Sequence, residues 1–306
     1  MIGVVINPNA LGVRRRRGLR SRLEALVGRR GEVVETQTPA ELSSVLARFR
    51  AAGVQLVAIC GGDGTNLATI TELVRAWGPR LPTIAILRGG TVNTIAQNLG
   101  IHGEPDQVLE RVIRHLDAGE EVPSRGQDLL AVNGLYGFLF AALMGARFLE
   151  AYYGGIRPGP AWAGVLAART IASSLWKGPF SRWLFAPVDL DLEVDGRRPA
   201  EVTRPRLIVA STVPDVGIGM RVAWQAGHQP GRFNLIASEL STTSMALQVH
   251  RVVGGRPLHG GPHLDVLAQR ARLRFREPEA YTFDGELFRG SDIEISVGPR
   301  LWIARP

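Results

Sequence analysis

Hydrophobic residues in the first 120 positions alternate between short apolar runs and helical stripes. Residues 2–6 form an uninterrupted apolar run, which predicts a buried strand, and Leu19, Leu23, Leu26 and Val27 recur at helical spacing. The same two patterns predict further strands at 32–36, 54–60 and 82–87, and further helices at 38–53, 66–77, 93–99 and 105–118. Alternating strands and helices of this kind predict a doubly wound, mostly parallel α/β sheet.

The pattern changes after about residue 120. Residues 188–194 alternate strictly between apolar and other side chains, and Asp195-Gly196 follows them as a turn. Similar strands are predicted at 206–213, 232–237, 271–276, 280–283, 292–297 and 301–304, with helical inserts at 160–176 and 242–253. We therefore predict an α/β domain over residues 1–122, joined by the C-terminal segment 300–306, and an antiparallel β-sandwich domain over residues 123–299.

An uncharged stretch between Asp128 and Arg147 is of borderline length for a membrane span. It contains Asn133-Gly134, a strong hairpin signal, so we expect two buried strands there and no transmembrane helix. The N-terminus lacks the features of a signal peptide. The single cysteine, Cys60, lies in an apolar run and is interpreted as a buried small hydrophobe, which favours a reducing, cytoplasmic setting.

A net charge of +8 and a pI near 10.7 favour polyanionic partners such as a nucleoside triphosphate, an anionic membrane or nucleic acid. We expect no nucleic-acid binding, since the chain has no recognition motif. The run Arg14–Arg17 is interpreted either as a solvated arm or as a phosphate or lipid contact. Trp176, Phe180, Trp183, Leu184 and Phe185, with Lys177 and Arg182, are either core residues or a membrane interface.

Two glycine-rich segments carry the strongest chemical signal. Gly61-Gly62-Asp63-Gly64-Thr65 follows a buried strand and precedes a helix, an arrangement that suits phosphate binding. It lacks the Lys-Ser/Thr of a Walker A loop, and Leu67 stands where a dinucleotide fingerprint needs glycine. Arg88-Gly89-Gly90-Thr91-Val92-Asn93 repeats the pattern after the next strand. The two loops predict a triphosphate cradle, with plain strand-to-helix turns as the alternative.

These motifs resemble those of the diacylglycerol kinase catalytic family, which includes sphingosine and ceramide kinases and is distantly related to NAD kinases. The matching motifs, in order along the chain, are Asn7-Pro8-Asn9, Gly61-Gly62-Asp63-Gly64-Thr65, Gly90-Thr91-Val92-Asn93 and Asp284-Gly285-Glu286. The resemblance implies a nucleotide-binding α/β domain, a β-sandwich lipid domain and an active site between them.

The resemblance also implies a role for each matching residue. Asp63 would take part in a water-linked Mg²⁺ network, with Asp128 near the metal, and Asp284 would be the general base, with Glu286 beside it. The residues implied in binding the nucleotide are Asn7, Gly61, Gly62, Gly64, Thr65, Gly90, Thr91 and Asn93.

Three departures from the family pattern bear on the substrate and the metal. Many diacylglycerol kinases have an acid where this chain has Thr94. The loop that binds a structural Mg²⁺ in many bacterial members corresponds to residues 225–231, which contain no carboxylate. Asn9-Ala10-Leu11-Gly12 replaces the family's serine-glycine after asparagine-proline.

The sequence thus predicts an ATP- and Mg²⁺-dependent lipid kinase acting on a diacylglycerol-type lipid. Alternatives are a sphingoid-base or ceramide kinase, a soluble kinase of a dinucleotide, and an inactive lipid-binding homologue. The expected partners are ATP and a lipid at the membrane surface, where a cytoplasmic protein would act peripherally. The sequence does not indicate the oligomeric state, and we keep a homodimer as an alternative to a monomer.

Overall fold

The computed structural model describes residues 1–78, 80–155, 160–175, 178–217 and 219–306. The chain divides into two compact units. The first contains Met1–Leu129, Leu135–Gly137 and Pro299–Pro306, and the second contains Leu130–Gly134 and Phe138–Gly298. Within the described residues, no helix is long and apolar enough to cross a membrane.

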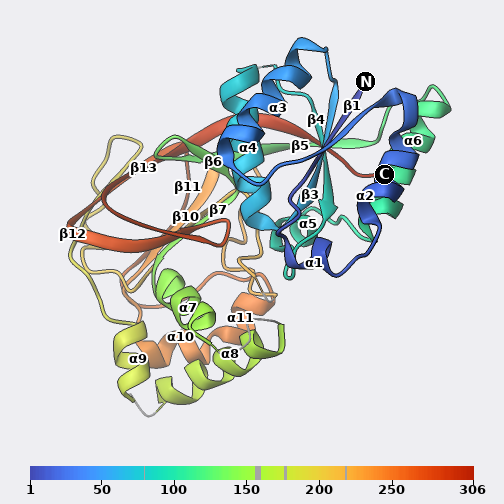
Figure 1. Ribbon diagram of the computed structural model, residues 1–306. Helices are drawn as coiled ribbons and strands as arrows, with labels where there is room; N and C mark the ends of the chain where they lie inside the picture. The colour runs from blue at the N-terminus through green and yellow to red at the C-terminus, as the bar shows by residue number, and fades with distance from the viewer. Residues whose placement is uncertain (79, 156–159, 176–177, 218) are drawn as a thin grey trace. The chain divides into compact units, whose positions relative to one another are not determined.

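The first unit is built on a parallel sheet with strand order β2-β1-β3-β4 (Figure 1). Its strands are β1 (Ile2–Ile6), β2 (Gly31–Glu35), β3 (Leu56–Gly61) and β4 (Thr83–Arg88). Every residue of β1 and β3 is buried, as expected for parallel strands covered on both faces. The end of the last strand, β13 (Glu286–Ala304), returns to this sheet, where Ile303 lies parallel to Ile84 of β4.

Helices cover both faces of this sheet, with α3 and α4 together on one face and α2 and α6 on the other (Figure 1). The helices are α1 (Leu11–Arg14), α2 (Leu19–Val27), α3 (Pro39–Ala51), α4 (Asp63–Trp77), α5 (Thr94–Asn98) and α6 (Pro105–Asp117), with a 3₁₀ turn at Gly28–Arg30. The predicted mostly parallel α/β sheet is confirmed. Leu116, near the end of α6, is exposed although it continues the apolar stripe of this helix.

The second unit is an antiparallel β-rich region, as predicted, with strand order β11-β10-β9-β7-β12-β13. Its strands are β7 (Leu139–Leu143), β8 (Leu190–Val194), β9 (Leu207–Ser211), β10 (Phe233–Ser238), β11 (His263–Ala268), β12 (Arg270–Phe283) and most of β13. The first half of β12 pairs with β8 and the second half with β7, and its register with β13 shifts between Arg274 and Glu279. The sheet therefore branches at this irregularity.

The uncharged stretch after Asp128 forms strands, as predicted, but three of them. β5 (Ser124–Val132) pairs with β6 (Leu135–Gly137) across Asn133-Gly134, and β7 follows directly. The expectation of two strands up to residue 146 was wrong at its end, since helix α7 (Met144–Tyr153) begins at Met144. The remaining helices are α8 (Pro160–Leu175), α9 (Pro179–Leu184), α10 (Thr242–Leu247) and α11 (Val249–Val253).

Three turns in the chain share one geometry: Asn133-Gly134, Asp195-Gly196 and Asp284-Gly285. In each, both residues have positive φ, with values of 47°, 48° and 47° at the first residue. Two positive φ angles define the type I′ turn that matches the twist of antiparallel strands, and Asn-Gly and Asp-Gly are its preferred sequences. The side chain of the first residue then bonds to the backbone of a neighbouring strand, for example Asn133 Oδ1 to Glu294 N at 2.8 Å.

The loop over residues 223–231 is held by a carboxylate from another strand. Asp265 of β11 accepts hydrogen bonds from Trp224 Nε1 at 2.7 Å, Gln225 Nε2 at 3.0 Å and Asn234 Nδ2 at 2.8 Å. Asn234 Oδ1 in turn accepts from the Gln225 backbone N–H at 3.2 Å. All three of these side-chain groups are N–H donors, and an N–H group that donates to a carboxylate does not bind a metal ion. Hydrogen bonds to Asp265 tie the loop to the sheet.

We predict that Asp265→Ala lowers the free energy of unfolding by about 2 kcal/mol, because it leaves three donors without their charged acceptor. The measurement is urea unfolding followed by tryptophan fluorescence. Asp292→Ala is the matched control: it removes an exposed carboxylate whose ion pair with Arg272 is screened by solvent and should contribute little. An equal loss in both variants would contradict the role given to Asp265.

A second prediction concerns Cys60, which is fully buried in β3 as the sequence suggested. Burial raises the pKa of its thiol from 9.0 to about 12. Because the thiolate is the reactive form, folded protein should not react with a thiol-specific chromogenic reagent at about pH 8. Reaction should become complete once guanidinium chloride unfolds the first unit. Rapid labelling of folded protein would show that this strand opens locally.

Candidate functional site

Three loops of the first unit end at the same edge of its sheet. They follow β1, β3 and β4, which are neighbours in the sheet, and parallel strands present their carboxyl ends together. The chain moves from β1 to β2 on one side and then to β3 on the other, so the strand order reverses between β1 and β3. In open α/β sheets, ligands bind outside the carboxyl ends of strands at such a point.

Glycines allow these loops to touch. A Cβ atom on Gly90 would lie 2.6 Å from Gly62 Cα, and one on Gly61 would collide with the Thr65 side chain. A Cβ on Gly12 would collide with the carbonyl oxygen of Gly89. Real Cβ atoms do not approach backbone this closely. The loops can therefore adopt these positions only with glycine at Gly12, Gly61 and Gly90.

Backbone hydrogen bonds fix the same contacts. Gly89 N–H donates to Gly61 O at 2.9 Å, and Val13 N–H donates to Gly89 O at 3.1 Å. Gly12 and Gly89 were not among the predicted site residues. Both were visible as glycines beside the motifs, but the loops they contact could be known only from the fold.

Asn7 links the first loop to the second across the reversal of strand order. Its Nδ2 donates to Thr65 Oγ1 at 2.9 Å, and its Oδ1 accepts from Asn9 N–H at 2.9 Å. Thr65 lies in the first turn of α4, together with Asp63 and Gly64. The first N–H groups of a helix have no partner within it and favour an anion. The structure thus brings the predicted residues of the first two loops together.

The Asp63 carboxylate connects the second loop to the third. It accepts from Thr94 N–H at 2.9 Å and from Ile95 N–H at 3.3 Å, the first two residues of α5. The side chain of Asn93, the N-cap residue of α5, makes no capping hydrogen bond. The Asp63 carboxylate caps α5 in its place. Both bonds use backbone groups, so they do not require an acid at position 94. A bound cation is not needed to explain why an acid stands here.

Asn93 shapes the third loop. It has a left-handed backbone with φ 53°, its Oδ1 accepts from Gly90 N–H, and its Nδ2 donates to Gly90 O, both at 2.9 Å. Asparagine tolerates this conformation better than most residues. Thr91, at the tip of the same turn, is exposed. The side chain of Asn93 is thus engaged within the loop, whereas Thr91 faces solvent.

The arginine run after the first loop has mixed contacts. Arg16 pairs with Glu104, lowers the pKa of that carboxyl, and donates through Nη1 to Gly12 O at 2.6 Å. Arg14, Arg15 and Arg17 are exposed. Contact between this run and a phosphate stays a prediction.

Asp128 has a basic partner instead of a cluster of acids. Its Oδ1 lies 2.9 Å from Nη1 of Arg300, and both residues belong to the first unit. In the described part of the chain, no group of three or more His, Cys, Asp or Glu could hold a metal ion by itself. The predicted metal role of Asp128 stays untested, and its ion pair gives the residue a structural purpose.

Asp284, the predicted general base, lies in the second unit and is 3% exposed. Its carboxylate accepts from Phe138 N–H at 3.1 and 3.2 Å and from Leu139 N–H at 2.8 Å. Tyr153 Oη donates to the carbonyl of Gly285 at 3.0 Å. Glu286 is exposed. The donors on Phe138 and Leu139 could not be identified from sequence, because their place beside Asp284 depends on strand pairing.

The other Asp-Gly turn repeats this arrangement. The Asp195 carboxylate accepts from Gln269 N–H at 3.0 Å and Arg270 N–H at 2.8 Å. The backbone N–H of each aspartate donates to the same neighbouring strand, at 2.9 Å for Asp284 and 3.0 Å for Asp195. The hydrogen bonds of Asp284 therefore have a structural explanation, and what sets it apart from Asp195 is its burial.

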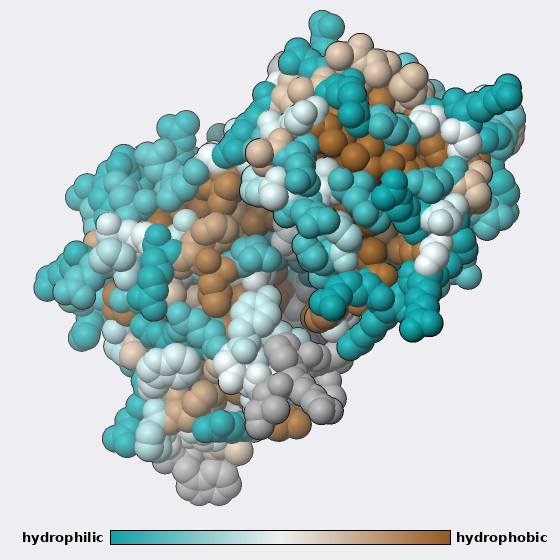
Figure 2. Space-filling view, viewed as in Figure 1, coloured by the Kyte–Doolittle hydropathy of each residue, from teal (hydrophilic) through white to brown (hydrophobic). Residues whose placement is uncertain are grey.

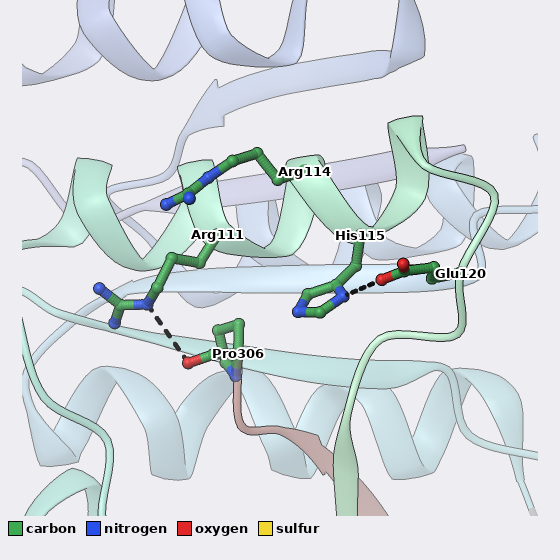
Figure 3. A pocket seen from close by; sticks show the side chains of 5 residues that line it. All are labelled: Arg111, Arg114, His115, Glu120 and Pro306. Carbon is green, nitrogen blue, oxygen red and sulfur yellow. Dashed lines mark hydrogen bonds and ion pairs between the residues drawn. The ribbon is translucent and has the colours of Figure 1, made fainter.

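Figure 3 shows a cavity of about 210 Å³ in the first unit, lined by Arg111, Arg114, His115, Glu120 and Pro306. Several of these groups pair with one another: Arg111 donates to Pro306 O at 3.2 Å, and His115 Nδ1 lies 2.8 Å from Glu120 Oε2. None of the residues in the three loops lines it. We therefore place the candidate site at the loops and not in this cavity.

Comparisons with known proteins bear on the fold and the family. Three solved structures from Bacillus anthracis, one of a diacylglycerol kinase and two of candidate diacylglycerol kinases, share the fold. Their TM-scores are 0.66, 0.71 and 0.69 at 13, 14 and 13% identity, and the alignments cover 100% of this chain and 96, 96 and 97% of theirs. No curated protein matches the sequence. The diacylglycerol kinase catalytic domain matches residues 1–120, which contain all three loops. Residues 1–120 are therefore similar to the diacylglycerol kinase catalytic domain.

Proposed function

We propose that the chain is an ATP-dependent lipid kinase that transfers the γ-phosphoryl group to the hydroxyl of a diacylglycerol-type lipid. The observation that carries this proposal is the meeting of three glycine loops at the reversal of strand order, within the matched catalytic domain. The fold shared with the Bacillus anthracis proteins supports it. Incubation of the protein with labelled ATP and a panel of lipids in detergent micelles tests it directly.

The nucleotide phosphates would lie against the loops after β3 and β4. Gly62 has room for a ligand beside it, because a Cβ there would meet only Gly90 Cα, at 3.4 Å. The N-terminus of α4 adds the N–H groups of its first turn and the positive end of the helix dipole. Asn7, Thr65 and Asn93 would fix the shape of the loops. Thr91 is exposed and could bond to a phosphate oxygen itself.

Magnesium fits this site as an ion carried with the nucleotide. Mg²⁺ keeps several waters and uses one or two carboxylates besides phosphate oxygens, so an all-protein cage is not required. Asp63 is the one acid within the three loops, and it lies at the start of α4 and beside the start of α5. When bound, the ion would neutralise the charge on the phosphates.

Asp284 would accept the proton of the lipid hydroxyl as that oxygen bonds to the γ-phosphorus and the bond to the β–γ bridging oxygen breaks. The two N–H donors of Phe138 and Leu139 hold the carboxylate in one orientation. A fixed base loses little entropy when the hydroxyl arrives. Glu286 follows in the same turn and would be a second acid near the hydroxyl.

More than one class of lipid carries a hydroxyl that this chemistry could phosphorylate. A sphingoid base or ceramide presents a similar hydroxyl, and Thr94 weakens the match to diacylglycerol kinases. The bonds of Asp63 to the backbone of α5 show that loop geometry survives with threonine at this position. The difference at Thr94 therefore bears on the choice of lipid more than on the presence of activity.

Gly62→Ala should weaken ATP binding at least about tenfold and leave the fold intact. The added methyl group is 3.4 Å from Gly90 Cα, an ordinary contact, and φ at Gly62 is −94°, which any residue adopts. The methyl would instead fill space that a phosphate needs, at a cost comparable to overpacking. Titration calorimetry with Mg-ATP measures the affinity, and thermal unfolding checks the fold.

Two further glycine variants are controls for this prediction. Gly61→Ala should lower stability by about 1–3 kcal/mol, because its methyl group collides with Thr65. Gly164→Ala, in α8 with open space around it, should leave ATP affinity unchanged and raise stability by up to about 1 kcal/mol, as expected when alanine replaces glycine within a helix. Full ATP affinity in Gly62→Ala would place the nucleotide elsewhere.

Asp284→Asn should reduce turnover about a hundredfold or more, the usual contribution of a general base, with little change in ATP affinity. An amide oxygen can still accept a backbone N–H, as Asn133 does in the same type of turn, so the fold should persist. Steady-state kinetics with the lipid that the wild type phosphorylates provide the measurement.

Asp195→Asn is the matched control for Asp284→Asn. It alters the same turn and the same pair of N–H bonds at a site that is partly exposed. If both variants lose the same stability and neither loses turnover, Asp284 is a turn residue and not the base.

A further inference from the structure

The two longest segments of the second unit without an acidic residue stand out, although the chain has 28 Asp and Glu in total. They are residues 151–188 and residues 240–264. Basic residues do occur in both; those in the described part of the chain are Arg169, Arg182, Arg251 and Arg256. The two segments are far apart in sequence. Because both lack acidic residues, we ask whether they lie in the same environment in the fold.

The structure joins these segments into one layer of helices within the second unit. We call α8, α9, α10 and α11 the helical layer (Figure 1). α8 packs against both α9 and α10, and α10 packs against α11. Ser181 of α9 bonds through its N–H to Ser173 Oγ of α8 at 3.1 Å, and Arg169 lies 4.4 Å from the centre of the Phe180 ring. The layer is therefore a packed surface free of negative side chains.

Each helix of this layer exposes a large apolar side chain: Val165 on α8, Trp183 on α9, Leu247 on α10 and Val253 on α11. Trp183 is 44% exposed and Leu247 64%. The space-filling view shows brown and pale residues with few teal ones over this part of the visible face (Figure 2). Exposed apolar residues on several adjacent helices indicate a binding surface more than scattered surface residues would.

Burial within the aromatic-basic cluster fits both interpretations, each for different residues. Leu184 and Phe185 are buried, as core packing predicts, whereas Trp183 and Arg182 are exposed, as a membrane interface predicts. Trp176 and Lys177 lie outside the described residues. The cluster therefore serves both purposes, with its apolar side in the core and Trp183 facing out.

We propose that the helical layer docks on the surface of an anionic lipid bilayer. Apolar side chains with arginines among them, and no acid to repel lipid phosphates, are the features of interfacial helices. Tryptophan favours the headgroup region, and long arginine side chains can keep their charge in water while their stems lie in apolar surroundings. The idea rests on the proposed function in one respect only, which is that the acceptor lipid would be met at this surface.

Cosedimentation with vesicles tests the docking without reference to catalysis. Full-length protein should bind vesicles of phosphatidylcholine with phosphatidylglycerol more tightly than phosphatidylcholine alone, and added salt should weaken the binding. Trp183→Ala combined with Leu247→Ser should lower the partition coefficient at least about tenfold. Arg182→Gln should lower it about fivefold.

Matched controls come from exposed residues of the same types elsewhere. Trp302→Ala with Leu116→Ser removes a tryptophan that is 52% exposed and a leucine that is 40% exposed in the first unit. Arg276→Gln removes an exposed arginine from β12. These variants should bind vesicles like the wild type. Equal losses in the control and test variants would overturn the proposal, as would equal binding to both kinds of vesicle.

Size-exclusion chromatography separates docking from self-association. A wild-type dimer that Trp183→Ala converts to monomer would make the layer an interface between copies and would overturn the proposal. Docking and catalysis can also fail separately. Vesicle binding without phosphorylation in detergent micelles would refute the kinase function alone, and phosphorylation in micelles without vesicle binding would refute the docking alone.

Discussion

The loops after β1, β3 and β4 approach one another so closely that Cβ atoms have no room between them, and the candidate site depends on this contact. Gly12 lies against the carbonyl of Gly89, Gly90 lies against Gly62, and Gly61 lies against Thr65. Side chains at Gly12 and Gly90 would push the loops apart and separate Asp63 from the start of α5, and one at Gly61 would distort its own loop at Thr65. Glycine is usually associated with freedom of the backbone, but here its value is close packing. The same contacts leave the backbone of Gly62 open on its other sides, where a ligand could approach.

Asp63 shows how one side chain can serve structure and chemistry together. Its carboxylate binds two backbone N–H groups of α5 and so ties the loop after β3 to the loop after β4. Such a cap contributes about 1 kcal/mol to stability. A negative charge held at this place would also attract a cation that accompanies phosphates. The acid inside a phosphate loop, which is unfavourable on charge alone, thus has a structural reason to be there.

The second unit uses one local device three times. Asn133, Asp195 and Asp284 each begin a two-residue turn with positive φ and use the side chain to hold a neighbouring strand. Only at Asp284 is the carboxylate buried, and burial in a fixed orientation is what a base needs in addition to a turn. The helical layer belongs to the same unit. It forms where two acid-free segments that are distant in sequence fold against each other.

Sequence alone determined the parallel sheet of the first unit, because strand and helix periodicities differ and local patterns report them directly. It also identified the glycine loops as candidates from their residue types and their place between strand and helix, whereas Asp284 was implied only by the resemblance to the kinase family. The helix from Met144 to Tyr153 was not predicted, because its residues continue an apolar stretch that reads equally well as strand. Only the tertiary structure decided that Asn7 bonds to Thr65, that Asp63 caps α5, that Phe138 and Leu139 hold Asp284, and that residues 151–188 meet residues 240–264. All of these contacts join residues far apart in the chain, and strand order and register, which are set by the packing of the whole sheet, bring them together.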